Sequence, residues 1–128
     1  MRQGPDVEVF GDAVGAARVA VLVTEALAAR GITDGHVAVS FVEAEEIAEL
    51  NVEHRGKDGP TDVLSFPVDG NGATPGPREV GDIVICPDHT TDLDEAIVHG
   101  ALHLAGMDHE TDAGEMLALQ DELMERLA

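Results

Sequence analysis

The pattern of apolar and polar residues along the chain predicts four short β-strands. In a strand the side chains point alternately to the two faces, so short runs of alternating or continuous apolar residues are the expected signal. Such runs cover residues 7–10, 36–42, 62–66 and 81–86. In the second run Val37, Val39 and Phe41 would share one face, and we expect that face to point into the core.

Longer segments carry apolar residues three and four positions apart, which predicts four helices. They cover about 12–30, 43–54, 92–105 and 112–127. Asp12 is the expected N-cap of the first helix, while the pairs Asp92/Glu95 and Asp112/Glu115 resemble capping boxes for the last two. Gly31 and Gly106 stand where glycine commonly ends a helix, so we expect the first helix to end before Gly31 and the third before Gly106.

The resulting order, β-α-β-α-β-β-α-α, predicts an α+β fold with one mixed four-stranded sheet and helices packed on it. A chain of 128 residues is the size of one domain, so we expect residues 1–128 to form a single unit. The stretch from Asp69 to Glu79 is rich in glycine and proline. We expect a flexible connection there and no domain boundary, because too little chain lies on either side for two cores.

The segment from His99 to His109 carries the strongest candidate chemistry. His99 and His103 are four residues apart, so on a helix their imidazoles project from one stripe, one turn apart. A stop at Gly106 would let the chain fold back and bring His109 to the same point. Three protein ligands with an open fourth position are typical of catalytic zinc, whereas structural zinc usually takes four.

The alternative is that these histidines are ordinary core and surface residues. The neighbours argue against it, because they make this segment one of the most apolar in the chain: Ala96, Ile97, Val98, Ala101, Leu102, Leu104 and Ala105. Burying two imidazoles in such a helix is costly unless both are satisfied. A bound metal satisfies them, so metal ligation is the favoured interpretation.

Composition narrows the function further. The chain has 26 acidic and 7 basic residues and a net charge of −19, which counts against broad nonspecific nucleic-acid binding. Aromatic residues make up 2 % with no Trp or Tyr, so the usual aromatic platforms for unpaired bases are lacking. The single cysteine, Cys86, excludes an internal disulfide and suggests a reducing compartment. Without a membrane-length apolar run or a signal peptide, we expect a soluble, cytoplasmic protein that binds no membrane.

The histidine spacing also occurs in a large class of zinc peptidases. Those enzymes carry a glutamate directly after the first histidine, which acts as general base toward the metal-bound water. Here that position is Gly100, which has no side chain, and this argues against peptidase activity by the usual route. A metal could still activate water for another hydrolytic reaction.

At this point the residues match a known family. The segment resembles the YbeY family of bacterial endoribonucleases, whose signature has the form His-Gly-x-Leu-His-Leu-x-Gly-x-Asp-His. Every fixed position of that signature is present: His99, Gly100, Leu102, His103, Leu104, Gly106, Asp108 and His109. Residues 60–67, Pro-Thr-Asp-Val-Leu-Ser-Phe-Pro, and 81–85, Gly-Asp-Ile-Val-Ile, also resemble family motifs in the expected order. The resemblance extends over roughly residues 7–127.

The resemblance implies an α+β fold with a layout related to the zinc peptidases. It also implies that His99, His103 and His109 bind a metal, usually one zinc ion per chain, and that single-stranded RNA is cleaved. The family acts in maturation of ribosomal RNA, notably the 3′ end of the small-subunit RNA, and in ribosome quality control. Ribosomal RNA is thus the expected substrate, a ribosomal protein or assembly factor a possible partner, and DNA not a substrate.

The resemblance implies a functional role for Arg55. By sequence alone, Arg55 and Lys57 form a small positively charged patch in a loop. Such loop charges most often have no specific function. The functionally important arginine of the family, just before the Pro-Thr motif, maps onto Arg55. A guanidinium in that place could hold the scissile phosphate and stabilise charge that develops in the transition state. Arg55 is therefore the candidate catalytic residue.

The chain departs from the family pattern in its details. Met107 stands where the family usually has an aromatic residue, and the connection from Cys86 to His99 is shorter than usual, so the metal helix could begin later. The acidic excess fits an RNA substrate poorly, unless a ribosome-associated partner delivers the RNA or the surface reflects a high-salt cytoplasm. Two alternatives remain: a metallopeptidase or other zinc hydrolase on the same scaffold, and a non-catalytic ribosome-assembly factor.

Overall fold

The computed structural model describes residues 4–69 and 76–128 and contains one four-stranded sheet with helices. The elements follow the chain in this order: β1 (Asp6–Phe10), α1 (Ala16–Ala28), β2 (His36–Phe41), α2 (Ala44–Arg55), β3 (Val63–Pro67), β4 (Glu79–Ile85), the short 3-10 turn η1 (Pro87–His89), α3 (Leu93–Leu104) and α4 (Glu115–Leu127). The predicted α+β class and the predicted order of elements are confirmed, with η1 as an addition.

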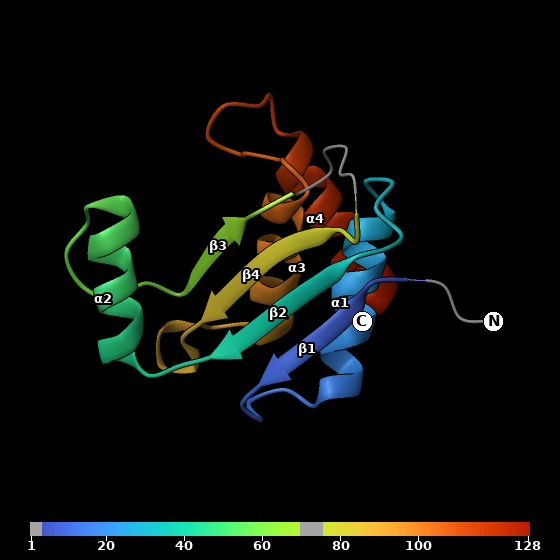
Figure 1. The fold of residues 1–128 in the computed structure, drawn as a ribbon. Coiled ribbons are helices and arrows are strands. Elements are labelled where there is room, and N and C mark those ends of the chain that lie inside the picture. The colour runs from blue at the N-terminus through green and yellow to red at the C-terminus, as the bar shows by residue number, and fades with distance from the viewer. Residues whose placement is uncertain (1–3, 70–75) are drawn as a thin grey trace.

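The sheet is mixed, with strand order β1-β2-β4-β3 (Figure 1). β1, β2 and β4 run parallel, and β3 is an antiparallel edge strand that pairs with β4. Helices α1, α3 and α4 lie on one side of the sheet, as Figure 1 shows. Their buried side chains form the main core with the inward-facing residues of the strands, among them the predicted Val37 and Val39.

Helix α2 lies apart from this layer, beyond the C-terminal ends of β2 and β4 and beside the start of β3 (Figure 1). It closes a second, smaller core around Ile47, Leu64, Val84 and Cys86. Cys86 is fully buried there as a free thiol. Because Phe66 of β3 packs on the same cluster, this smaller core joins α2 to the edge strand.

The predicted start of the first helix was wrong. Asp12 is not its N-cap; α1 begins at Ala16 behind an extended Gly15, which makes no side-chain cap. Val14 and Val19 flank this start at the two positions of a hydrophobic staple, and both pack in the main core. Packing of apolar residues, and not an acidic cap, therefore sets where α1 begins.

The predicted glycine stop after α1 is confirmed, although the helix itself ends at Ala28 and not at about Arg30. The Ile32 N–H donates to the Leu27 carbonyl and the Gly31 N–H to the Ala28 carbonyl, at 3.0 Å each. Gly31 has a φ of 82°, so these bonds form the glycine-terminated turn that the sequence indicated.

The predicted capping box of α4 was wrong in its position, because Asp112 is not the N-cap and the helix starts later. Its N-cap is Gly114, and α4 runs from Glu115. The Asp112 carboxylate nevertheless accepts hydrogen bonds from the N–H groups of Gly114 (2.8 Å) and Met116 (2.9 Å). Glu115 in turn accepts one from the Ala113 N–H at 3.1 Å. The two side chains thus satisfy free N–H groups at the helix start, as a capping box does.

The predicted flexible connection falls in part on residues 70–75, which lie outside the described residues. Its end was placed too late, since Glu79 already belongs to β4. No helix in the part of the chain that the structure describes is long and apolar enough to span a membrane.

Candidate metal centre and the cavity around it

Helix α3 positions the first two histidines of the site. It begins behind Asp92, whose side chain accepts a hydrogen bond from the Glu95 N–H at 3.1 Å, so the predicted cap is present. The short connection after Cys86 is accommodated by η1 and does not remove this cap. From this start, the helix turns most of its surface into the core and leaves His99 and His103 on one partly exposed stripe.

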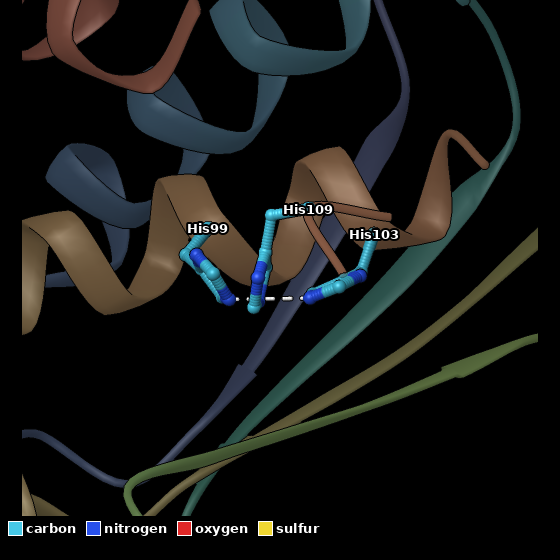
Figure 2. Close-up of side chains that lie close together, drawn as sticks. All are labelled: His99, His103 and His109. Carbon is cyan, nitrogen blue, oxygen red and sulfur yellow. Dashed lines mark hydrogen bonds between the residues drawn. The ribbon is translucent and has the colours of Figure 1, made fainter. Parts of the chain in front are cut away.

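The turn after α3 brings the third histidine back. Gly106, with a φ of 93°, donates to the His103 carbonyl, and the Met107 N–H donates to the Leu102 carbonyl. This pair of bonds is the reversal that glycine permits at a helix end. In the view of Figure 2, the His109 ring lies between those of His99 and His103. The ring centroids are 4.7 Å apart for His99 and His103, 5.1 Å for His99 and His109, and 5.4 Å for His103 and His109.

One ring nitrogen of each of the α3 histidines is held by a partner behind it. His99 Nδ1 lies 2.7 Å from Gln120 Oε1, and His103 Nδ1 lies 2.9 Å from the Met107 carbonyl oxygen. Both partner atoms accept hydrogen bonds, so each Nδ1 carries the proton and each Nε2 presents a lone pair. A partner of this kind fixes both the tautomer and the orientation of a metal-binding histidine.

The two Nε2 atoms face each other at 3.1 Å (Figure 2). Burial lowers the pKa of His103, and the neighbouring His99 lowers it further against the opposing effect of the Met107 hydrogen bond. His103 is therefore neutral at pH 7, and its Nε2 can accept a hydrogen bond or bind a cation. At this separation both Nε2 atoms can reach one ion, so the donor set fits a metal.

His109 completes the set. One ligand atom from each of His99, His103 and His109 lies within 4.8 Å of the others, and in the described part of the chain no other group of His, Cys, Asp and Glu meets this criterion. We call these residues the histidine triad. It could hold a metal ion through imidazole nitrogens, a set that suits zinc and other first-row transition metals.

Gly100 has a structural reason for lacking a side chain. A Cβ atom built there would lie 2.6 Å from Cγ2 of the fully buried Ile83 and 3.3 Å from Ser65 Oγ. Ser65 also donates a hydrogen bond to the Gly100 carbonyl at 3.1 Å. The residue after the first histidine is thus packed against β3 and β4, and no general base can stand there in this arrangement.

The histidine triad opens into a cavity of about 1070 Å³, which also reaches the C-terminal end of α2 and the whole of β3. Ligand pockets commonly span roughly 300–1,000 Å³, so this one lies at the upper end and suits an extended substrate. Arg55 lines the same cavity and is exposed. The structure thus places all four predicted site residues around one cavity, although they come from α2, α3 and the turn after α3.

The charge around the cavity is uneven. Among the described residues, Arg55 is the one Arg or Lys that lines it, and it belongs to none of the salt bridges between them. The acidic lining residues are Asp62, Asp92, Glu95, Asp108 and Glu110. A negatively charged ligand would therefore meet its favourable charge at Arg55 and at any cation that the histidine triad holds.

Gln120 is the site residue that the sequence did not identify. It is 6 % exposed and reaches His99 from α4, 21 positions further along the chain. A signal did exist, because Gln120 stands four residues after Met116 and three before Leu123, on the buried stripe of α4. A buried polar side chain at such a position needs a partner, but the sequence does not name which one.

Comparison with known proteins links this arrangement to one family. Residues 12–128 match the family described as endoribonuclease YbeY. An endoribonuclease YbeY of Rubrobacter xylanophilus is 45 % identical over 130 residues, covering 93 % of this chain and 93 % of that protein. One from Corynebacterium glutamicum is 40 % identical over 113 residues, covering 71 % of this chain but only 58 % of the longer relative.

The fold is similar to a solved structure as well. The solution structure of the Thermotoga maritima protein TM1509 matches with a TM-score of 0.57 and 29 % sequence identity. The match covers 94 % of this chain and 88 % of that one, so the likeness extends over nearly all of the sheet and its helices.

Proposed function

Because this chain belongs to the YbeY family of endoribonucleases, we propose that it is a metal-dependent hydrolase that cleaves single-stranded RNA. In this proposal residues 1–128 act as one catalytic domain. The observation that carries it is the shared cavity, in which an exposed guanidinium and a convergent set of imidazole nitrogens line the same space. Phosphodiester cleavage is accelerated by cationic groups that stabilise the developing charge and by a Lewis-acid metal that activates water or polarises a phosphoryl oxygen.

We propose one zinc ion per chain, bound by the histidine triad. Neutral imidazole nitrogens are preferred zinc ligands, and the Nδ1 contacts leave the Nε2 lone pairs of His99 and His103 free to bind. When bound, such an ion supplies Lewis-acid chemistry, which makes water more acidic and withdraws charge from a phosphate oxygen.

Arg55 is the proposed phosphate-binding residue. It is the last residue of α2 and lines the cavity. No salt bridge among the described residues occupies its guanidinium. Its planar donors can bind two oxygens of one phosphate, and its charge offsets the charge that grows on those oxygens during cleavage. The remaining acidic lining would repel phosphates that are not held at Arg55 or at the metal.

For the biological substrate we propose ribosomal RNA, with a role in maturing the 3′ end of the small-subunit RNA and in ribosome quality control. This part rests on family membership, as does the proposed cytoplasmic location. With a net charge of −19, the chain gains little from nonspecific attraction to RNA, so a ribosomal protein or assembly factor is the proposed means of delivery.

The non-catalytic alternative is a ribosome-assembly factor in which the metal only fastens the turn at His109 to α3. It predicts that the metal matters for stability and not for RNA turnover. The peptidase alternative is not favoured, because Gly100 is packed against Ile83 and offers no base.

The test is cleavage of a short single-stranded RNA by zinc-loaded protein, compared with His103→Ala, Arg55→Ala and the same RNA in duplex form. We expect loss of one electrostatic contact at Arg55 to slow cleavage about 100- to 1,000-fold. His103→Ala should fall to background, and the duplex should be cut far more slowly than the single strand.

Equal cleavage by all three proteins would show that the activity belongs to a contaminating nuclease and would refute the proposal. Turnover of a peptide library at a rate above that of RNA would support the peptidase instead. A folded His103→Ala variant that still restores ribosome maturation in a deletion strain would favour the assembly factor.

A further inference from the structure

An aromatic pair lines the same cavity as the histidine triad. His54, in the last turn of α2, and Phe66, near the end of β3, have ring centroids 4.8 Å apart and planes inclined by 66°. This is an edge-to-face contact, the arrangement that aromatic rings prefer. Both residues line the cavity.

The two rings differ in how firmly they are held. Phe66 is partly buried and packs on the smaller core around Ile47 and Leu64. The His54 side chain is 50 % exposed, and its nearest ionic neighbour, Glu53, is 4.0 Å away. Phe66 thus orders the imidazole, while part of that imidazole stays open to the cavity and to solvent.

Apart from histidines, few rings are available to a ligand here. The chain has three phenylalanines and no Trp or Tyr. Phe41 packs on the main core, and Phe10 lies exposed on the edge strand β1, so Phe66 is the one that lines the cavity. Composition alone had suggested that the protein lacks an aromatic platform, but that count left out histidine.

Arg55, the residue next to the aromatic pair, suggests which kind of ligand the pair would contact. Arg55 directly follows His54, and both side chains line the same cavity. In a nucleotide, base and phosphate are joined through one sugar, so adjacent residues at a helix end can contact both. A base that stacks on a protein ring must first leave its own stack, which selects unpaired strands.

We propose that His54 and Phe66 form a stacking site for one unpaired nucleobase of the substrate, beside the phosphate bound by Arg55. The site reads no sequence, because every base has a π-face. This inference rests on the proposed cleavage of RNA and adds a binding contact that precedes it. It accounts for a preference for single strands in a protein whose overall charge disfavours RNA.

Binding is measured on the zinc-loaded protein with a short single-stranded 2′-O-methyl RNA that carries 2-aminopurine at successive positions. We expect strong quenching of the fluorescent base at one position, and about tenfold weaker binding by His54→Ala. His54→Trp should bind at least as tightly as the original protein, because indole is a larger stacking surface. Phe10→Leu is the matched control, and its binding should be unchanged.

A second measurement removes the base and not the ring. An abasic nucleotide at the quenched position should weaken binding to the original protein about as much as His54→Ala does. The abasic RNA should bind His54→Ala no more weakly than the intact RNA does, since the contact is already gone. Phe66→Leu keeps an apolar side chain on the smaller core and should lower affinity through a less ordered His54; its melting temperature reports whether it folds.

Equal affinities for the original protein and His54→Ala would overturn the inference, as would an abasic penalty that is the same for both. Cleavage of RNA without any dependence on His54 would contradict the stacking site alone. Binding that depends on His54 but yields no cleavage by zinc-loaded protein would contradict the endoribonuclease and leave the stacking site standing. If the original protein does not bind the oligonucleotide at all, both proposals are wrong.

Discussion

The cavity has two walls that are built in opposite ways. The helical wall consists of α3, the turn after it and α4, and its histidines are held from behind by Gln120 and by the Met107 carbonyl. The opposite wall consists of the end of α2 and β3, where Arg55 and His54 are exposed. One wall is fixed by buried contacts, and the other presents exposed side chains to solvent.

The difference follows from what each wall would bind. A metal requires ligand atoms at fixed positions, because misplaced nitrogens coordinate it less strongly. Imidazoles that rotate freely also lose conformational entropy when they bind the metal. A polymer arrives from solvent with many conformations, so groups that bind its phosphates and bases must be reachable. Each wall can therefore be tested by a different measurement, metal retention for the first and RNA affinity for the second.

The largest expected effect separates the two walls. His103→Ala removes a proposed metal ligand. It should lower metal affinity by more than the roughly 10–100-fold that is typical when a ligand loses its hydrogen-bond partner. Arg55→Ala should keep its metal, because that side chain belongs to the opposite wall. Metal content after dialysis against a weak chelator measures both. His89→Ala, on the cavity wall but outside the histidine triad, is the control; equal metal content in all four proteins would break the comparison.

The next effect concerns the packing beneath the helical wall. Gly100→Ala would place a methyl group 2.6 Å from Ile83 Cγ2, inside the closed main core. Overpacking of this kind costs about 1–3 kcal/mol, and we expect the upper end because Ile83 is fully buried. Chemical denaturation measures the free energy of unfolding.

The matched control is Gly76→Ala, since a methyl group there meets nothing within 4 Å and the residue lies outside the helices and strands. A difference of only a few tenths of a kcal/mol, small beside the roughly 1–3 kcal/mol of overpacking, between Gly100→Ala and Gly76→Ala would show that α3 can move away from the sheet. In that case Gly100 would no longer exclude the glutamate of a peptidase on packing grounds.

The smallest effect concerns the partner behind His99. Gln120→Met keeps the volume on α4 but leaves His99 Nδ1–H without its acceptor, so metal affinity should fall about 10- to 100-fold. Gln120→Glu keeps an acceptor and should retain most of the affinity. Competition with a chromophoric chelator gives the dissociation constants, and the cobalt spectrum shows whether the ligand set has changed. An identical affinity for Gln120→Met and the original protein would mean that His99 is held by the helix alone.

The helical wall was largely predictable because its information is local. The four-residue spacing of His99 and His103, the cap at Asp92 and the stop at Gly106 all act within one helix and its turn. Each of these features follows from hydrogen bonds that the backbone groups at a helix end must form locally.

What the sequence did not reveal depends on contacts between distant segments. Gln120 meets His99 only because α4 packs beside α3, and His54 meets Phe66 only because the smaller core joins α2 to β3. The start of α1 was misjudged for a related reason: packing of apolar residues set it, whereas Asp12 offered only a local possibility. Arg55 was assigned from the family resemblance, and the cavity supplies the physical link that local pattern could not.

The contact of His103 with the Met107 carbonyl has a consequence for sequence variation. The group that orients the imidazole belongs to the backbone, so the side chain at position 107 is free to change without disturbing that bond. The departure at Met107 from the family's usual aromatic residue is thus compatible with an intact site. The length of the segment is not free in the same way, because one inserted residue between His103 and Met107 would carry that carbonyl out of reach. At position 107, this hydrogen bond thus tolerates a change of side chain but not an inserted residue.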